Sequence, residues 1–264
     1  MCHDTDGRPP IPPIAGGALD ARTVTLTAPD GTRFSAFHAR AAARTGAAAR
    51  SGAGVLILPD VRGLHPYYED LALRFAEHGA DALAIDYFGR TAGTGGRDTG
   101  FEFMPHVEQA TFEHLSADME AAAAWLRSEE GGAVERLYVV GFCFGGRLAF
   151  VANAMGLDLA GAIGFYGKPV GEGRAGVPAP VERAGRMTAP VLGLFGGADA
   201  GISASDVAAF EAALAAADVP HRLVTYPDAP HSFFDRKADE FVETSAKAWS
   251  EVLDFIGLGA AAPA

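Results

Sequence analysis

The chain has 264 residues, enough for one large α/β domain, and its 49% hydrophobic and 20% charged residues are typical of a globular protein with an ample core. A formal net charge of −12, with no block of basic residues, argues against nucleic acid or an anionic membrane surface as a partner. No apolar run reaches the ~18 residues that span a bilayer, and the polar, proline-rich start does not resemble a signal peptide, so we expect a cytoplasmic protein.

Strands and helices alternate along the predicted chain. An opening hairpin surrounds the turn at residues 29–31, and later strands include continuous apolar runs, as expected for strands buried on both faces. The predicted strands are 23–28, 33–40, 54–60, 81–88, 136–142, 159–167, 190–199 and 221–228. The predicted helices are 67–79, 106–129, 145–155, 203–217 and 239–256, and residues 89–100 form a predicted glycine-rich loop.

This alternation predicts an α/β fold with a mostly parallel central sheet and helices on both of its faces. We find neither an internal repeat nor a second hydrophobic core behind a linker. The expected organisation is a single domain at 19–258, with a flexible N-terminal arm at 1–18 and a flexible C-terminal tail at 259–264.

Three residues with side chains suited to catalysis lie at the ends of predicted strands, where the functional sites of open α/β sheets are found. They are Cys143, Asp199 and His231, and their order of nucleophile, acid and histidine is that of the α/β hydrolases. Each has a simpler interpretation: a free cysteine is often a buried small hydrophobe, a strand-end aspartate often caps a helix, and a loop histidine is usually solvated. The three types in this order favour a catalytic triad.

The stretch "GFCFGG" at 141–146 predicts a nucleophile elbow, a sharp turn between strand and helix. Gly141 and Gly145 flank Cys143 where a Cβ would clash with neighbouring backbone. The helix N-terminus and a nearby histidine both lower the pKa of a thiol. The N–H of Phe144 can bind a developing oxyanion, and Val61, after the strand 54–60, is placed to supply the second donor.

Further polar residues are candidates for the surroundings of the thiol. Asp60 lies at a strand tip from which it can face Cys143, although Pro-Asp is also a common turn pair. Tyr166 ends a strand and can line a pocket, with core packing as the alternative. His65 is a candidate for the pocket rim, with solvent exposure as the alternative.

Neither a metal nor a cofactor is expected. His106 and His114 are eight residues apart on a predicted helix, whereas a helical metal site prefers histidines at i and i+4. The sequence does not indicate an oligomeric state.

With these motifs the chain resembles the dienelactone hydrolases, a cysteine-nucleophile branch of the α/β-hydrolase fold. The resemblance spans residues 20–257 and rests on "GFCFGG", "LPDVRGLHPYYEDLALRFAEHGADALAIDYF", "SADMEAAAAWLR", "AIGFYG", "LFGGAD" and "PHSFF". It implies a hydrolase of the carboxymethylenebutenolidase class, in which a Cys143–His231–Asp199 triad cleaves a small-molecule ester or lactone through a thioester acyl-enzyme. It also implies that an acidic residue in the place of Asp60 holds the resting thiol and helps to activate it.

Two departures from the family pattern concern the substrate. Well-known members carry Glu at the place of Asp60, and they bind the substrate carboxylate with arginines, one of them four residues after the catalytic histidine. Here that position is Asp235, with Arg236 next to it as a candidate substrate contact, and Arg97 lies in a loop without a clear register. The alternatives are therefore an esterase for short-chain aryl or alkyl esters without dienelactone activity, or a non-hydrolytic protein that kept the fold.

Overall fold

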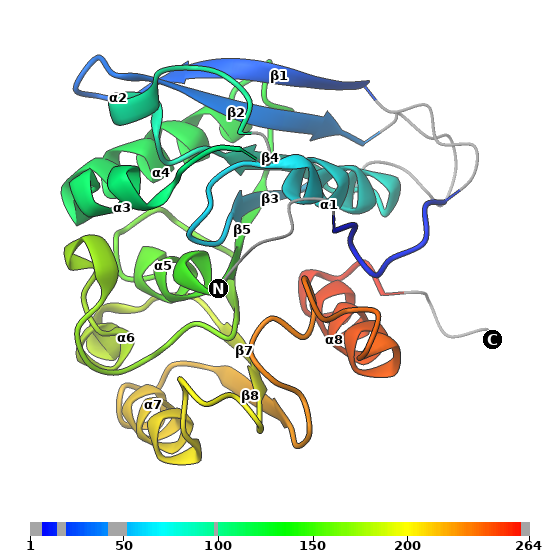
Figure 1. Cartoon of the computed structure of the whole chain (residues 1–264), viewed down its shortest axis with the longest axis vertical. Helices are drawn as coiled ribbons and strands as arrows, with labels where there is room; N and C mark the ends of the chain where they lie inside the picture. Colours follow the sequence, from blue (N-terminus) through cyan, green and yellow to red (C-terminus); the bar gives the residue numbers. More distant parts are fainter. Residues whose placement is uncertain (1–6, 15–19, 42–51, 98–99, 260–264) are drawn as a thin grey trace.

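A computed structural model describes residues 7–14, 20–41, 52–97 and 100–259 (Figure 1). In these ranges eight strands form one sheet in the order β1-β2-β4-β3-β5-β6-β7-β8. The strands are β1 (Asp20–Thr27), β2 (Arg33–Arg40), β3 (Ala53–Leu58), β4 (Asp81–Ile85), β5 (Arg136–Phe142), β6 (Gly161–Phe165), β7 (Val191–Gly196) and β8 (His221–Tyr226). The α-helices are α1 (Pro66–Glu77), α2 (Gly89–Ala92), α3 (Met104–Gln109), α4 (Phe112–Arg127), α5 (Phe144–Ala152), α6 (Pro180–Arg183), α7 (Ala204–Ala216) and α8 (Val242–Ile256).

The sheet is mostly parallel, as predicted. The strands β1, β2 and β4 pair antiparallel, whereas every pair from β4 through β3 to β8 is parallel. Because the carboxyl ends of parallel strands meet at one edge of a sheet, the loops after β3, β5, β6, β7 and β8 come together there.

Helices cover both faces of this sheet, as Figure 1 shows for α1 and α8 on one side and α4 and α5 on the other. Every residue of β3 is buried, and its side chains alternate between the two layers. Val55 and Ile57 join the core beneath α1 and α8, while Leu56 and Leu58 join the core beneath α4 and α5. The continuous apolar run therefore has the expected cause, burial on both faces.

The prediction of one continuous helix at 106–129 is wrong, because two helices, α3 and α4, occupy this region. Thr111 separates them in an extended conformation (φ −127°, ψ 152°), and its hydroxyl oxygen accepts a hydrogen bond from the His114 N–H. This side chain caps the first turn of α4 and so offers the backbone an alternative to continued helix. The predicted loop at 89–100 likewise begins with one turn of helix, α2.

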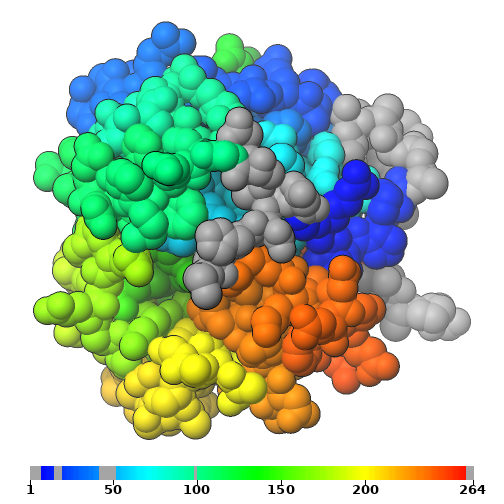
Figure 2. Space-filling model, viewed as in Figure 1, coloured from blue at the N-terminus to red at the C-terminus, as the bar shows by residue number. Residues whose placement is uncertain are grey.

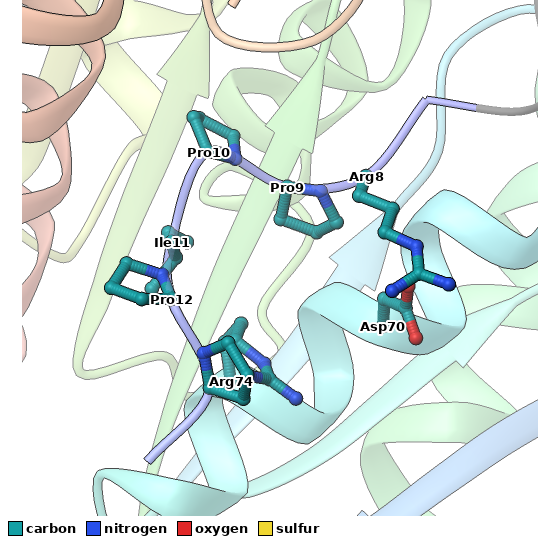
Figure 3. Close-up of a pocket in the computed structure, with 8 residues that line it drawn as sticks. Arg8, Pro9, Pro10, Ile11, Pro12, Asp70 and Arg74 are labelled. Atoms are coloured by element: carbon teal, nitrogen blue, oxygen red, sulfur yellow. The ribbon is translucent and has the colours of Figure 1, made fainter.

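Part of the predicted N-terminal arm lies on the surface beside α1, in dark blue in Figure 2. Ile11 is buried in the core, and the Ile14 N–H donates to Glu77 at 3.2 Å. A hollow of about 330 Å³ is lined by residues 8–13 and by Asp70 and Arg74 of α1 (Figure 3). Residues 1–6 and 15–18 of the arm and 260–264 of the tail lie outside the described residues. Within the described ranges, no helix is both long and apolar enough to cross a membrane.

Candidate active site

The predicted elbow joins β5 to α5, and Cys143 is its single connecting residue. Cys143 has φ 55° and ψ −110°, a conformation that is strained for a residue other than glycine. Its N–H donates to the Phe165 carbonyl at 3.0 Å, which ties the turn to the end of β6. The partly exposed thiol is thereby held at the carboxyl edge of the sheet.

The glycines around the thiol are required by close backbone approaches, as predicted. A Cβ on Gly141 would overlap the carbonyl of Gly145, and a Cβ on Gly145 would overlap the carbonyl of Leu58 at the end of β3. A Cβ on Gly146 would meet the carbonyl of Phe165. The turn is therefore wedged between β3 and β6, the two strands that flank β5.

Asp199 and His231 approach this edge from the loops after β7 and β8. The Asp199 Oδ2 and the His231 Nδ1 are 2.6 Å apart, and Asp199 Oδ1 also accepts the Gly201 N–H at 2.8 Å. Burial raises the pKa of the Asp199 carboxyl, but its hydrogen bonds to His231 and to the Gly201 backbone outweigh burial, and the net direction is down. Because a carboxylate can only accept, Nδ1 donates to it, which leaves Nε2 for the thiol.

Asp199 and Cys143 both affect the pKa of His231. Burial lowers the pKa of its imidazole, but hydrogen bonds to Asp199 and Cys143 more than compensate, and the pKa rises to about 10. The imidazole can therefore hold a proton at neutral pH.

The raised pKa of His231 predicts how the stability of the folded chain depends on pH. Below the unfolded-state pKa of about 6.5 the charged imidazole stabilises the folded chain in full, and this contribution is lost as the pH rises toward the folded value of about 10. The melting temperature of the wild type should exceed that of His231→Gln most near pH 6, and by less near pH 9.5. Thermal unfolding across this range measures the gap, and a constant gap would contradict the assignment.

A Cys143→Ala background is the matched control for this measurement. Removing the thiol removes one of the two interactions that raise the pKa of His231. In this background, the difference in melting temperature between the chain with His231 and the chain with His231→Gln should disappear at a lower pH than it does in the wild type. The reason is that Asp199 alone then stabilises the charged imidazole.

Two backbone N–H groups were predicted as oxyanion donors. Phe144 is the first residue of α5, so its N–H has no partner within the helix. Among the described residues, neither this group nor the Val61 N–H donates a hydrogen bond to another group of the chain. Both donors are therefore available to a ligand, and their role as an oxyanion hole stays a prediction.

Asp60 has a partner that the sequence reasoning missed. Its buried carboxylate accepts from the Arg62 side chain at Nε (3.0 Å) and at Nη2, and from the Arg62 backbone N–H at 2.8 Å. Burial raises the pKa of the Asp60 carboxyl, but the interactions with His65 and Arg62 overcome it and hold the pKa far below its usual range. No hydrogen bond joins this carboxylate to Cys143 in the part of the chain that the structure describes. The only available signal was the Asp-x-Arg spacing.

The predicted substrate contacts lie in three different surroundings. Tyr166 is fully buried with a positive φ of 39°, its ring centroid is 4.9 Å from that of His231, and its hydroxyl donates to Asp235 at 3.2 Å. His65 is also buried, with its Nε2 4.0 Å from Asp60, so the alternative of solvent exposure is wrong. Arg236 donates to the Ser232 hydroxyl at 3.2 Å.

Two further arginines near this edge are engaged by the chain itself. Arg97 donates to Asp86 at 2.9 Å and to the Gly93 carbonyl at 2.7 Å. Arg147, one helical turn after Cys143, was missed by the sequence reasoning. Its guanidinium donates to five backbone carbonyls, those of Lys168, Val170, Gly171, Val177 and Pro178. It thereby fixes the loop after β6 to the elbow helix.

Within the described residues, no group of three or more His, Cys, Asp or Glu side chains is arranged to hold a metal ion. The dienelactone hydrolase family model matches residues 37–258. The chain belongs to this family. It is therefore a hydrolase, and its similarity to solved structures that include a puromycin hydrolase (TM-score 0.71, 20% identity) places it in the α/β-hydrolase fold.

Relatives of this dienelactone hydrolase family member cover most of its length. A Salmonella typhimurium protein, provisionally named a carboxymethylenebutenolidase, is 32% identical over 246 residues, which are 90% of this chain and 87% of that protein. A Bradyrhizobium protein, provisionally named a 2-oxo-3-(5-oxofuran-2-ylidene)propanoate lactonase, is 26% identical over 76% of this chain and 82% of that protein. A Klebsiella pneumoniae structure, provisionally named a dienelactone hydrolase, has 29% identity and a TM-score of 0.75, covering 90% of this chain and 99% of its own.

Proposed function

We propose that this hydrolase cleaves an ester or lactone bond of a small molecule through a thioester on Cys143. The observation that carries the proposal is the 2.6 Å contact between His231 and Asp199, with Cys143 as the second partner of the same imidazole. A thiol on a strained elbow, a base within reach and a carboxylate that orients the base are the parts that acyl transfer requires.

The first half of the reaction forms the acyl-enzyme. The Cys143 proton passes to His231 Nε2, and the sulfur attacks the carbonyl carbon, whose oxygen becomes an oxyanion. The N–H groups of Phe144 and Val61 donate to that oxygen, and each such donor is typically worth about 3–4 kcal/mol. The tetrahedral intermediate collapses, its C–O bond breaks, and the leaving oxygen takes the proton from His231.

The second half returns the enzyme to its starting state. His231 takes a proton from a water molecule, which attacks the thioester carbon. The C–S bond breaks, the sulfur leaves as a thiolate beside the imidazolium, and a carboxylic acid is released. A lactone gives a single hydroxy acid, whereas an open-chain ester gives an alcohol and an acid.

The provisional names of the relatives support lactones, and a separate observation supports uncharged esters. Arg97 and Arg147 donate to groups of the chain, and Asp235 lies beside Tyr166 at the site. A substrate carboxylate would meet this buried acid, and a net charge of −12 gives it no long-range attraction. A short-chain aryl or alkyl ester is therefore the second candidate substrate. The intact triad argues against a protein that only kept the fold.

One assay tests the proposal. We expect a Cys2→Ser variant to hydrolyse p-nitrophenyl acetate and to lose this activity in proportion to the Cys143 peptide alkylated by iodoacetamide, because the thiol is the nucleophile. Dienelactone, an uncharged lactone and aryl esters then rank the substrates by kcat/KM. Full activity after complete alkylation of Cys143 would reject the thioester mechanism.

A further inference from the structure

Asp60 and Cys143 lie just beyond the carboxyl ends of the neighbouring strands β3 and β5. In the β3–β5 ladder Leu58 is opposite Gly141, and each of the two residues lies two positions further along its chain. The Tyr87 hydroxyl donates to the Pro59 carbonyl at 2.8 Å. Burial raises the pKa of Tyr87, and the charges of both Asp60 and Cys143 act on it in the same direction. Because β3 and β5 are adjacent and Leu58 lies opposite Gly141, Asp60 and Cys143 follow neighbouring strand ends, where the charge of one can act on the other.

An unpaired carboxylate at this place would oppose the reaction. A negative charge in a buried site disfavours a second one nearby, so it would keep the Cys143 thiol protonated. Arg62 removes that charge from the site. Its Nε lies 3.0 Å from each Asp60 oxygen, its Nη2 donates to Oδ2, and both side chains are about 95% buried.

We propose that Arg62 is a positioning residue that holds the Asp60 carboxylate away from the Cys143 thiol and cancels its charge, so that His231 alone accepts the thiol proton. The inference rests on the proposed thioester mechanism. It also assigns Asp60 a role other than proton acceptor: Asp60 is the anchor of Arg62. The deeply lowered pKa of Asp60 agrees, because such a carboxylate is a poor base.

Other charged and titratable groups face the pair and the thiol. Beside Asp60 lie His65 of the same loop, Tyr67 and Tyr68 of α1, Tyr87 after β4 and Asp235 after β8. Beside Cys143 lie His231 and Tyr166. Burial raises the pKa of each of these tyrosines, which stay neutral, and burial and then Asp60 raise the pKa of Asp235. Arg62 is the cation that directly contacts Asp60.

The test is the pH dependence of Cys143 alkylation by iodoacetamide, followed by the mass of the Cys143 peptide in a Cys2→Ser chain. Arg62→Met should raise the midpoint of this profile by about one pH unit or more, because Asp60 loses its buried guanidinium partner. At pH values below the midpoint, the thiolate fraction, and with it kcat/KM for p-nitrophenyl acetate, should fall about tenfold for a shift of one unit. Adding Asp60→Asn should return the midpoint to that of the parent chain.

The rescue separates this role from simple support of the fold, since a second substitution in a merely structural pair would not restore a pH profile. Arg90→Met is the matched control. It breaks the ion pair of Arg90 with Asp118 and Asp30, far from the thiol in the sequence, and should leave the midpoint unchanged. Where Arg62→Met does not fold, Arg62→Lys should shift the midpoint in the same direction by a smaller amount.

Two outcomes would overturn the inference: an unchanged midpoint in the folded Arg62 variant, or a double variant as shifted as the single one. Neither outcome depends on turnover, because alkylation reports the thiol directly. Hydrolysis that persists after complete alkylation would instead reject the thioester mechanism, so the two failures are distinguishable.

Discussion

Replacing Cys143 by alanine should lower kcat for p-nitrophenyl acetate by more than ~10³-fold, because no acyl-enzyme can form without the sulfur. Cys143→Ser should retain only a small part of the activity. A hydroxyl has a far higher pKa than a thiol and must lose its proton during the attack. Steady-state rates and the mass of a trapped acyl-enzyme measure both effects.

The comparison is informative because the alanine variant should still fold. Cysteine and alanine both carry a Cβ, so the strain at the positive φ of this residue is the same in both chains. The melting temperature should therefore change little while the activity disappears. Activity close to that of the wild type in a folded Cys143→Ala protein would remove the thiol from the mechanism.

Gly145→Ala should damage both stability and catalysis. The new Cβ would overlap the backbone carbonyl oxygens of Leu58, the last residue of β3, and of Pro59, which follows it. The elbow must then move, at a cost of about 2 kcal/mol or more in unfolding free energy. Because the thiol moves with the elbow, kcat/KM should fall by about 100-fold. Thermal unfolding and ester hydrolysis give the two readouts.

Gly185→Ala is the matched control. Beyond the adjoining residues of the chain, no atom of the described residues lies within 4 Å of the Cβ that this change would add, and Gly185 does not have a positive φ. Its unfolding free energy should stay within about 0.5 kcal/mol of the wild type, and its activity should be unchanged. If Gly145→Ala behaves like Gly185→Ala, the elbow is more adaptable than its backbone contacts indicate.

The strands could be predicted from the sequence, and the residues of the proposed triad could be chosen from it, for different reasons. Continuous apolar runs such as that of β3 occur where both faces of a strand are buried, so the run itself indicates a parallel sheet under two layers of helices. The residues of the proposed triad could be chosen because Cys143, Asp199 and His231 each follow a strand, and parallel strands bring their ends together. The glycines at 141 and 145 added the strained turn. In each case the evidence lies in a short stretch of sequence, and the parallel sheet brings the separate stretches together in space.

The break between α3 and α4 was also encoded locally, by Thr111, but the apolar spacing on both sides concealed it. A hydrophobic period reports which face of a helix is buried, and it does not register a single capping hydrogen bond. The position of β2 was not available from local pattern. Its antiparallel pairing with β4 joins residues more than forty positions apart, and the pairing depends on how the hairpin packs against the sheet.

The fold class, the family and the three residues of the proposed triad could be inferred from spacing and residue type alone. The partner of each buried charge could not, because it depends on which groups the fold brings together. Asp60 lies two residues from Arg62 in the sequence and, in the fold, follows the strand end next to that of Cys143, and nothing in the local pattern chooses between the two partners. Because Asp60 is buried, it pairs with Arg62. A carboxylate removed from water needs a counter-charge that donates several hydrogen bonds, which a guanidinium provides and a neutral thiol does not.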